Sequence, residues 1–225
     1  SLVCRKCDTP YPIVGGIPRL LPVALAAGAA ATAHRFGYEW AHFADMRPAV
    51  KAFVKRLGQG HTISVTTFGE RPTLQVDYTL DVASVIRGID KVFPASGSGS
   101  YLLEAVEVAC SALSRRDADR PVIVAVTAGG PEFSDRPHTE FPPKLRECGA
   151  TFDVMVLVGQ PPDLSDSGQR NREMFLDVAT RATGGDRVPL LSSLALDGAL
   201  AKLADELTGQ YRITYSRPER LIPPE

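Results

Sequence analysis

Residues 122–127 read VIVAVT and residues 152–158 read FDVMVLV, and these two stretches decide the fold class. Both are rich in β-branched residues and almost continuously apolar, which is typical of strands that are covered on both faces of a sheet. Apolar residues recur at helical spacing in the segments that follow, over Phe141–Cys148, Asn171–Ala182 and Leu194–Leu207. Strands that alternate with helices predict a largely parallel α/β sheet with helices on both faces.

The segment before these strands predicts an antiparallel edge. A helix is expected over Pro48–Leu57, strands over His61–Phe68 and Thr73–Tyr78, and another helix over Asp81–Phe93. Only Gly69–Pro72 joins the two strands, and a parallel pair would need a long crossover. The two strands must therefore be antiparallel neighbours at one side of an open sheet.

The remaining segments complete this order. A Ser/Gly loop, Ser96–Ser100, precedes a long helix that runs to about Leu113, and short strands are expected near Val188–Leu191 and over Tyr211–Tyr215. In open α/β sheets, ligands bind outside the carboxyl ends of the strands. That edge should hold the Ser96–Ser100 loop and Thr127–Gly130.

Composition and charge exclude several classes of function. The chain has 225 residues, of which 44% are hydrophobic, so it can form one large domain with an appendage. Twenty-five Lys and Arg against 26 Asp and Glu give a net charge of −1, which provides no overall basic field for nucleic acid or anionic lipid. The apolar run Leu20–Ala33 is shorter than the roughly 20 residues of a membrane span, and Pro22 and Gly28 interrupt it. Its pattern also mimics a signal peptide, although it begins behind a Cys-x-x-Cys.

From about residue 47 to 216, the order of segments resembles a von Willebrand factor A domain, particularly the variety common in bacterial proteins. The matching stretches are FVKRLGQGHTISVTTFGERP, GSGSYLLEAVEVA, RPVIVAVTAGGPEFSD, LDVATRATGGDRVPL and LADELTGQYRITYSRP. The third resembles the strand that ends in a Thr-Asp-Gly motif in that family. The resemblance implies a Rossmann-like open sheet and a role in binding other proteins, with residues 217–225 as a Pro-rich tail.

Such domains usually hold magnesium or manganese at the carboxyl rim through an Asp-x-Ser-x-Ser, a Thr and an Asp, all oxygen donors that hard cations prefer. Ser100 stands where the Thr is expected, but Ala128 stands where the Asp is expected. No Asp-x-Ser-x-Ser precedes the first helix, where the nearest acid is Asp45, and the usual first strand of the sheet is expected to be missing. The comparison implies a degenerate site without Mg²⁺ or Mn²⁺, whose ligand-binding rim consists of Ser98, Ser100 and Thr127.

Residues 1–46 form a leader rich in Cys, Pro and Gly. The text CRKCDTPYPIVGGIPRLLP followed by RFGYEWAHF resembles the zinc-binding leader of some bacterial S-adenosylmethionine-dependent methyltransferases. In that family the Cys-x-x-Cys is one half of a four-cysteine ribbon, so Cys4 and Cys7 would supply two of the four ligands of a zinc ion. The alternatives are that Cys4 and Cys7 form a redox pair, that they are two plain thiols, or that they bind a zinc ion shared between two chains.

Signatures of catalysis are missing from the sequence. It contains neither Gly-x-Ser-x-Gly nor a phosphate-binding Gly-x-x-x-x-Gly-Lys-Ser/Thr motif. Ser100 is interpreted as the N-cap of the helix that follows it, and Cys110 and Cys148 as inert core residues. The sequence therefore predicts a non-enzymatic module that binds another protein. The alternatives are an accessory part of a methyltransferase with a zinc-binding leader, and a fragment without function.

Overall fold

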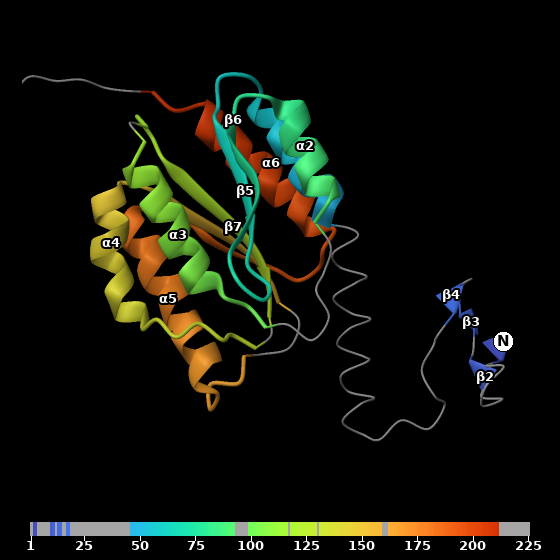
Figure 1. The fold of residues 1–225 in the computed structure, drawn as a ribbon. Helices are drawn as coiled ribbons and strands as arrows, with labels where there is room; N and C mark the ends of the chain where they lie inside the picture. Colours follow the sequence, from blue (N-terminus) through green and yellow to red (C-terminus); the bar gives the residue numbers. More distant parts are fainter. Residues whose placement is uncertain are drawn as a thin grey trace, which may run out of the picture.

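The computed structural model describes residues 46–92, 99–116, 118–129, 131–158 and 162–211, together with four two-residue strands near the N-terminus. These are β1 (Leu2–Val3), β2 (Pro10–Tyr11), β3 (Ile13–Val14) and β4 (Ile17–Pro18), which pair antiparallel as β1–β2 and β3–β4. The rest is an α/β body (Figure 1). Within the described residues, no helix has the length and apolar character that crossing a bilayer requires.

The first part of the body comprises a helix over residues 46–57, β5 (Ile63–Thr67), β6 (Thr73–Thr79) and α2 (Val82–Asp90). β5 and β6 are antiparallel, which confirms the predicted edge. α2 begins after Asp81, whose Oδ1 accepts a hydrogen bond of 2.9 Å from the backbone N–H of Ala83 and so caps the helix. Val85 and Ile89 of α2 pack against Val54, so the hairpin and the two helices share a small apolar cluster.

The second part carries the parallel sheet. Its elements are α3 (Leu102–Ser114), β7 (Val122–Ala128), η1 (His138–Glu140), α4 (Phe141–Cys148), β8 (Thr151–Leu157), α5 (Ser167–Thr183), β9 (Arg187–Leu190) and α6 (Ala195–Thr208). The strands pair in the order β7–β8–β9, with Val122 opposite Thr151 and Val154 opposite Arg187, and all are parallel. The predicted α/β fold class is confirmed.

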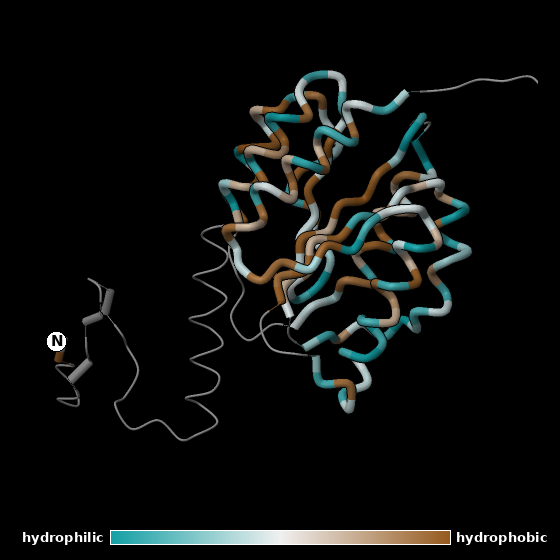
Figure 2. Tube along the Cα trace, turned by 180° about the vertical axis from the view of Figure 1, so that it is seen from behind, coloured by the Kyte–Doolittle hydropathy of each residue, from teal (hydrophilic) through white to brown (hydrophobic). Residues whose placement is uncertain are grey.

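Helices cover both faces of this sheet. On one face α3, α4 and α5 enclose the largest apolar cluster, in which the Phe175 ring lies 4.8 Å from that of Phe141 and 5.5 Å from that of Phe152, centroid to centroid. On the other face, α6 and the helix over residues 46–57 pack on a second cluster around Met155 and Leu200. Figure 2 shows the apolar strands running between the more polar outer surfaces of the helices.

β8 contributes to both clusters because its side chains alternate between the two faces. Phe152, Val154 and Val156 point into the first cluster, and Met155 into the second. Asp153, on the second side, is buried, and its Oδ1 accepts a hydrogen bond of 2.8 Å from the backbone N–H of Asp186. Burial raises the pKa of Asp153 above the ordinary value of an aspartate, because it disfavours the charged form.

Cys110 and Cys148 form a disulfide between α3 and α4, with their Cα atoms 5.6 Å apart. The prediction that both are inert thiols was therefore wrong. Each residue does lie on a buried helix face, as the apolar periodicity indicated. The sequence did not reveal that α3 and α4 pack side by side, which is what brings the two sulfur atoms together.

A gap separates the two parts of the sheet. Among the described residues β5 pairs only with β6, and β7 only with β8 on its sheet, so the facing edges of β5 and β7 carry no strand between them. Whether the first strand of the fold is missing stays a prediction, because residues 19–45, which precede the first helix, lie outside the described residues. Of the predicted final strand, Tyr211–Tyr215, only Tyr211 lies within the described residues, and the proposed boundaries at residues 46 and 216 stay predictions.

Candidate functional site

Four strands end at one edge of the body, which we call the carboxyl rim. It consists of Gly129, Val158 and residues 68–71, 99–101, 131–135, 162–166 and 191–194. The backbone N–H of Tyr101 donates to the carbonyl of Phe68 over 2.8 Å, which joins the end of β5 to the start of α3. Ser100 bridges to the loop after β7, because its N–H donates to Pro131 and its carbonyl accepts from Phe133. The rim is thus a continuous hydrogen-bonded edge.

Glu132 is buried at this rim and caps α3 from the neighbouring loop. Its Oε1 accepts hydrogen bonds from the backbone N–H of Leu102, over 3.1 Å, and from the hydroxyl of Ser134. The Ser134 hydroxyl in turn accepts from the N–H of Leu103 over 3.2 Å. An acceptor oxygen is needed here because the first N–H groups of a helix have no partner within the helix.

Ser100 therefore does not cap α3, and that prediction was wrong. The N-cap position is Tyr101, which makes no side-chain capping bond. The Ser100 hydroxyl is buried and acts on the Glu132 carboxyl group instead, where it lowers the pKa against the larger opposite effect of burial. A nearby residue in the sequence is the usual cap, so pattern alone favoured Ser100 over a glutamate thirty positions away.

Arg172 places a buried positive charge beneath the same rim. Its side chain is 2% exposed; Nη1 donates to the carbonyl of Ala128 over 3.1 Å, and Nη2 lies 3.3 Å from Oε1 of Glu173. Burial raises the pKa of Glu132, while the hydrogen bond from Ser134 and the charge of Arg172 act in the opposite direction. The net effect is that the neutral form of Glu132 is favoured relative to a glutamate in water.

The Glu132→Gln variant should reveal this shift. The folded state raises the pKa of Glu132. Glu132 therefore contributes its full stabilisation at a pH below the ordinary pKa of glutamate, and this stabilisation is lost as the pH rises through the pKa that Glu132 has in the folded state. Glutamine does not titrate, so it has no such loss. The free energy of unfolding of the variant should therefore rise relative to that of the wild type as the pH increases from about 4 to about 7. Urea unfolding across that range measures the difference.

Glu70→Gln is the matched control, because Glu70 is an exposed glutamate on the same rim. A gain of the same size in Glu70→Gln would mean that the substitution itself, and not the burial of Glu132, is responsible. Parallel curves for Glu132→Gln and the wild type would contradict the assignment.

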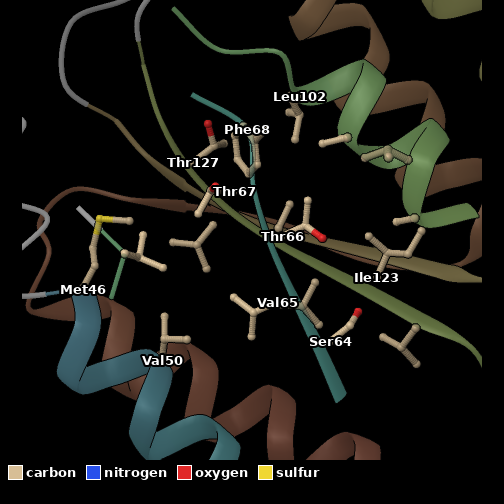
Figure 3. Close-up of a pocket in the computed structure, with 18 of the residues that line it drawn as sticks. Met46, Val50, Ser64, Val65, Thr66, Thr67, Phe68, Leu102, Ile123 and Thr127 are labelled. Atoms are coloured by element: carbon tan, nitrogen blue, oxygen red, sulfur yellow. The ribbon is translucent and has the colours of Figure 1, made fainter. Parts of the chain in front are cut away.

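The predicted site residues fall into two groups. Ser100 lies on the carboxyl rim and Thr127 near the end of β7, and both line the same cavity, in which Figure 3 labels Thr127 together with Phe68 and Leu102. The Thr127 hydroxyl donates to the carbonyl of Ala128 over 3.2 Å. Ser98 and the predicted zinc ligands Cys4 and Cys7 lie outside the described residues. Sequence reasoning missed Glu132, Ser134 and Arg172, for which the sequence offers no signal beyond the place of Glu132 in the loop after a strand.

Large apolar side chains are exposed along the rim. They occur in the loops that follow β7, β8 and β9, and they are Phe133, Val158, Leu164, Leu191 and Leu194, which we call the apolar rim patch. Leu191 is 88% exposed and Leu194 is 83% exposed. The N–H of Val158 donates to the carbonyl of Leu190 over 2.8 Å, so two of these loops are neighbours. Exposed apolar side chains on neighbouring loops are a feature of interaction sites.

Part of the chain is similar to one known family, and its fold is similar to that of several solved structures. Residues 34–131 match the family described as the von Willebrand factor type A domain. Among solved structures, a von Willebrand factor type A protein from Catenulispora acidiphila has a TM-score of 0.58 at 12% identity, over 74% of this chain and 38% of that chain. The conserved hypothetical protein BatB from Bacteroides thetaiotaomicron has a TM-score of 0.58 at 16% identity, over 75% of this chain and 89% of that chain.

A third structure is that of proximal thread matrix protein 1 from the mussel byssus, described with a zinc-occupied MIDAS motif. It has a TM-score of 0.54 at 16% identity, over 72% of this chain and 40% of that chain. This chain thus spans less than half of two of the three proteins. No curated protein matches it.

Proposed function

We propose that this chain is a non-catalytic module that binds another protein through its carboxyl rim. Its fold is similar to that of von Willebrand factor type A domains, a domain type that generally mediates protein interactions. The observation that carries this proposal is the apolar rim patch, whose side chains come from three successive strand-to-helix loops. A soluble partner with a complementary apolar surface would remove these side chains from water. Burial of that kind is the main favourable contribution to protein association.

The metal site of this fold is degenerate in our proposal. A divalent cation needs oxygen donors, and Ala128 supplies a methyl group where a carboxylate is expected. The carbonyl of Ala128 already accepts from Arg172, whose positive charge opposes a second cation nearby. Glu132 points its Oε1 at the N-terminus of α3. No group of three or more His, Cys, Asp or Glu side chains able to hold a metal occurs in the part of the chain that the structure describes.

Titration with Mg²⁺ or Mn²⁺ should therefore show no binding tighter than about millimolar, since the site offers too few oxygen donors to replace the water around the ion. Isothermal calorimetry on the whole chain measures this directly. Ser100→Ala serves as the matched variant, because Ser100 occupies the one position that retains a hydroxyl of the expected type. Micromolar affinity in the wild type that Ser100→Ala abolishes would contradict the degenerate site.

The interaction itself is tested by placing charge on the rim patch. The Leu191→Asp/Leu194→Asp variant should lose the partners that the wild type selects from a displayed library of natural protein fragments, in the presence of a chelator. Leu80→Asp is the control: Leu80 is also an exposed leucine, but it follows β6, which runs antiparallel to β5 and ends at the opposite edge. Partners lost equally with Leu80→Asp, or retained with the rim variant, would refute the proposed surface.

A further inference from the structure

The gap between β5 and β7 is an elongated cavity of about 1510 Å³. That volume exceeds the roughly 300–1,000 Å³ of most small-molecule pockets. It is lined without interruption by residues 61–71, which include β5, and by residues 120–129, which include β7. Both free strand edges therefore face one another across it, each with backbone groups that no described strand pairs. Unpaired backbone groups in such a place favour the addition of a strand.

The two walls of this cavity differ in chemistry. One wall is apolar: Val50 and Phe53 of the helix over residues 46–57 lie beside Val65, which packs with the same cluster. Side chains alternate along β5, so Ser64 and Thr66 face the opposite wall, toward α3. Figure 3 shows the Ser64 and Thr66 hydroxyls in the cavity together with Val50 and Val65. A strand that fits must be apolar on one side and can carry hydroxyl groups on the other.

We propose that residues 211–217 of this chain enter the cavity as a parallel strand between β5 and β7. The segment reads YRITYSR, in which Tyr211, Ile213 and Tyr215 alternate with Arg212, Thr214 and Ser216. Ile213 and Tyr215 match the wall formed by the helix over residues 46–57, and Thr214 matches the hydroxyl-bearing wall. Tyr211 is 93% exposed and stands where the strand would begin. Its β-branched and aromatic residues favour the extended conformation.

The place where the described chain stops supports this occupant. α6 ends at Thr208, and two residues later the side chain of Gln210 accepts a hydrogen bond of 2.7 Å from Nη1 of Arg120. Arg120 lies two residues before β7, and both Gln210 and Leu207 line the cavity. The chain therefore leaves α6 at the amino-terminal end of β7, where a parallel neighbour of β7 must begin.

Length also agrees. β7 has seven residues, and seven residues run from Tyr211 to Arg217 before Pro218. Proline has no N–H to donate, so it ends pairing in the interior of a sheet.

The handedness of the connection from β9 through α6 also supports this position for the strand. The crossovers from β7 to β8 and from β8 to β9 use α4 and α5 on the same face as α3. α6 lies on the opposite face and packs across Leu190, Met155 and Val124, which belong to β9, β8 and β7 in turn. A return toward β7 over the opposite face gives a crossover of the same, right-handed sense, which nearly all such connections have.

Hydrogen exchange of the whole chain, followed by mass spectrometry, tests the inference. Amides of residues 212–216 should exchange at least about 100-fold more slowly than those of residues 219–222, because only the former would be hydrogen-bonded in a sheet. Ile213→Asp should speed exchange in β5 and β7 and leave β9 unchanged. Leu221→Asp, in the same tail but beyond Pro218, is the matched control and should change none of these strands.

Each other outcome overturns the inference. Equal exchange along the whole tail would mean that residues 212–216 form no strand, and faster exchange in β9 after Ile213→Asp would place the strand elsewhere. Protection that is lost on dilution, together with a dimer in sedimentation, would assign the strand to a second copy. If Ile213→Asp does not fold, a photoreactive side chain at position 213 decides: cross-links to β5 or β7 within one chain support the inference, and cross-links elsewhere refute it.

Discussion

Reducing the Cys110–Cys148 disulfide should lower the free energy of unfolding by about 4 kcal/mol. The two cysteines are 38 residues apart, so the crosslink closes a long loop that the reduced, unfolded chain would leave open. Because both sulfur atoms lie in the largest apolar cluster, the folded state should survive reduction with its helices in place. Urea unfolding with and without reductant measures the difference.

A Cys110→Ala/Cys148→Ala double variant separates this effect from chemistry at Cys4 and Cys7. Its free energy of unfolding should equal that of the reduced wild type, apart from a small loss caused by the missing sulfur contacts. Adding reductant should not destabilise the double variant further. A full loss of stability on adding reductant to the double variant would show that other thiols are responsible.

Truncating Phe175 to alanine should cost about 3–5 kcal/mol of unfolding free energy. Its side chain is 0% exposed and contacts the rings of both Phe141 and Phe152, so the variant leaves a cavity where α4, α5 and β8 meet. Met174→Ala is the matched control: it is the adjacent residue on α5 and is 47% exposed. Its effect should remain within about 0.5 kcal/mol. Similar losses for both variants would mean that helix propensity, and not the aromatic cluster, determines the result.

Most of the fold could be predicted from the sequence because the relevant signals are local. The apolar stretches of β7 and β8, the short connection between β5 and β6, and the periodicity of α5 and α6 each depend on residues close together in the chain. Boundaries shifted by a few residues, as at α5, which begins at Ser167 because Asp166 caps it by accepting from the N–H of Gln169. The disulfide escaped prediction because it depends on how two separate helices pack.

The candidate site could be predicted only in outline. Ser100 and Thr127 were placed at the rim by the rule that ligands bind at the carboxyl ends of parallel strands. Glu132 and Arg172 were missed because their burial depends on loop-to-helix contacts over 30 and 44 positions. A glutamate and an arginine are usually exposed, so composition gave no reason to place either in the interior.

Asp153 has a consequence for how the sheet is aligned during folding. Its carboxyl group is held on the Met155 side of β8, where it accepts a hydrogen bond from the backbone N–H of Asp186. If β8 slipped by one residue against its neighbours, every side chain would exchange faces. The carboxyl group would then lie among the rings of Phe141 and Phe175 without a hydrogen-bond donor. Asp153 therefore destabilises misaligned pairings of β8, which the apolar residues of the strand alone would allow.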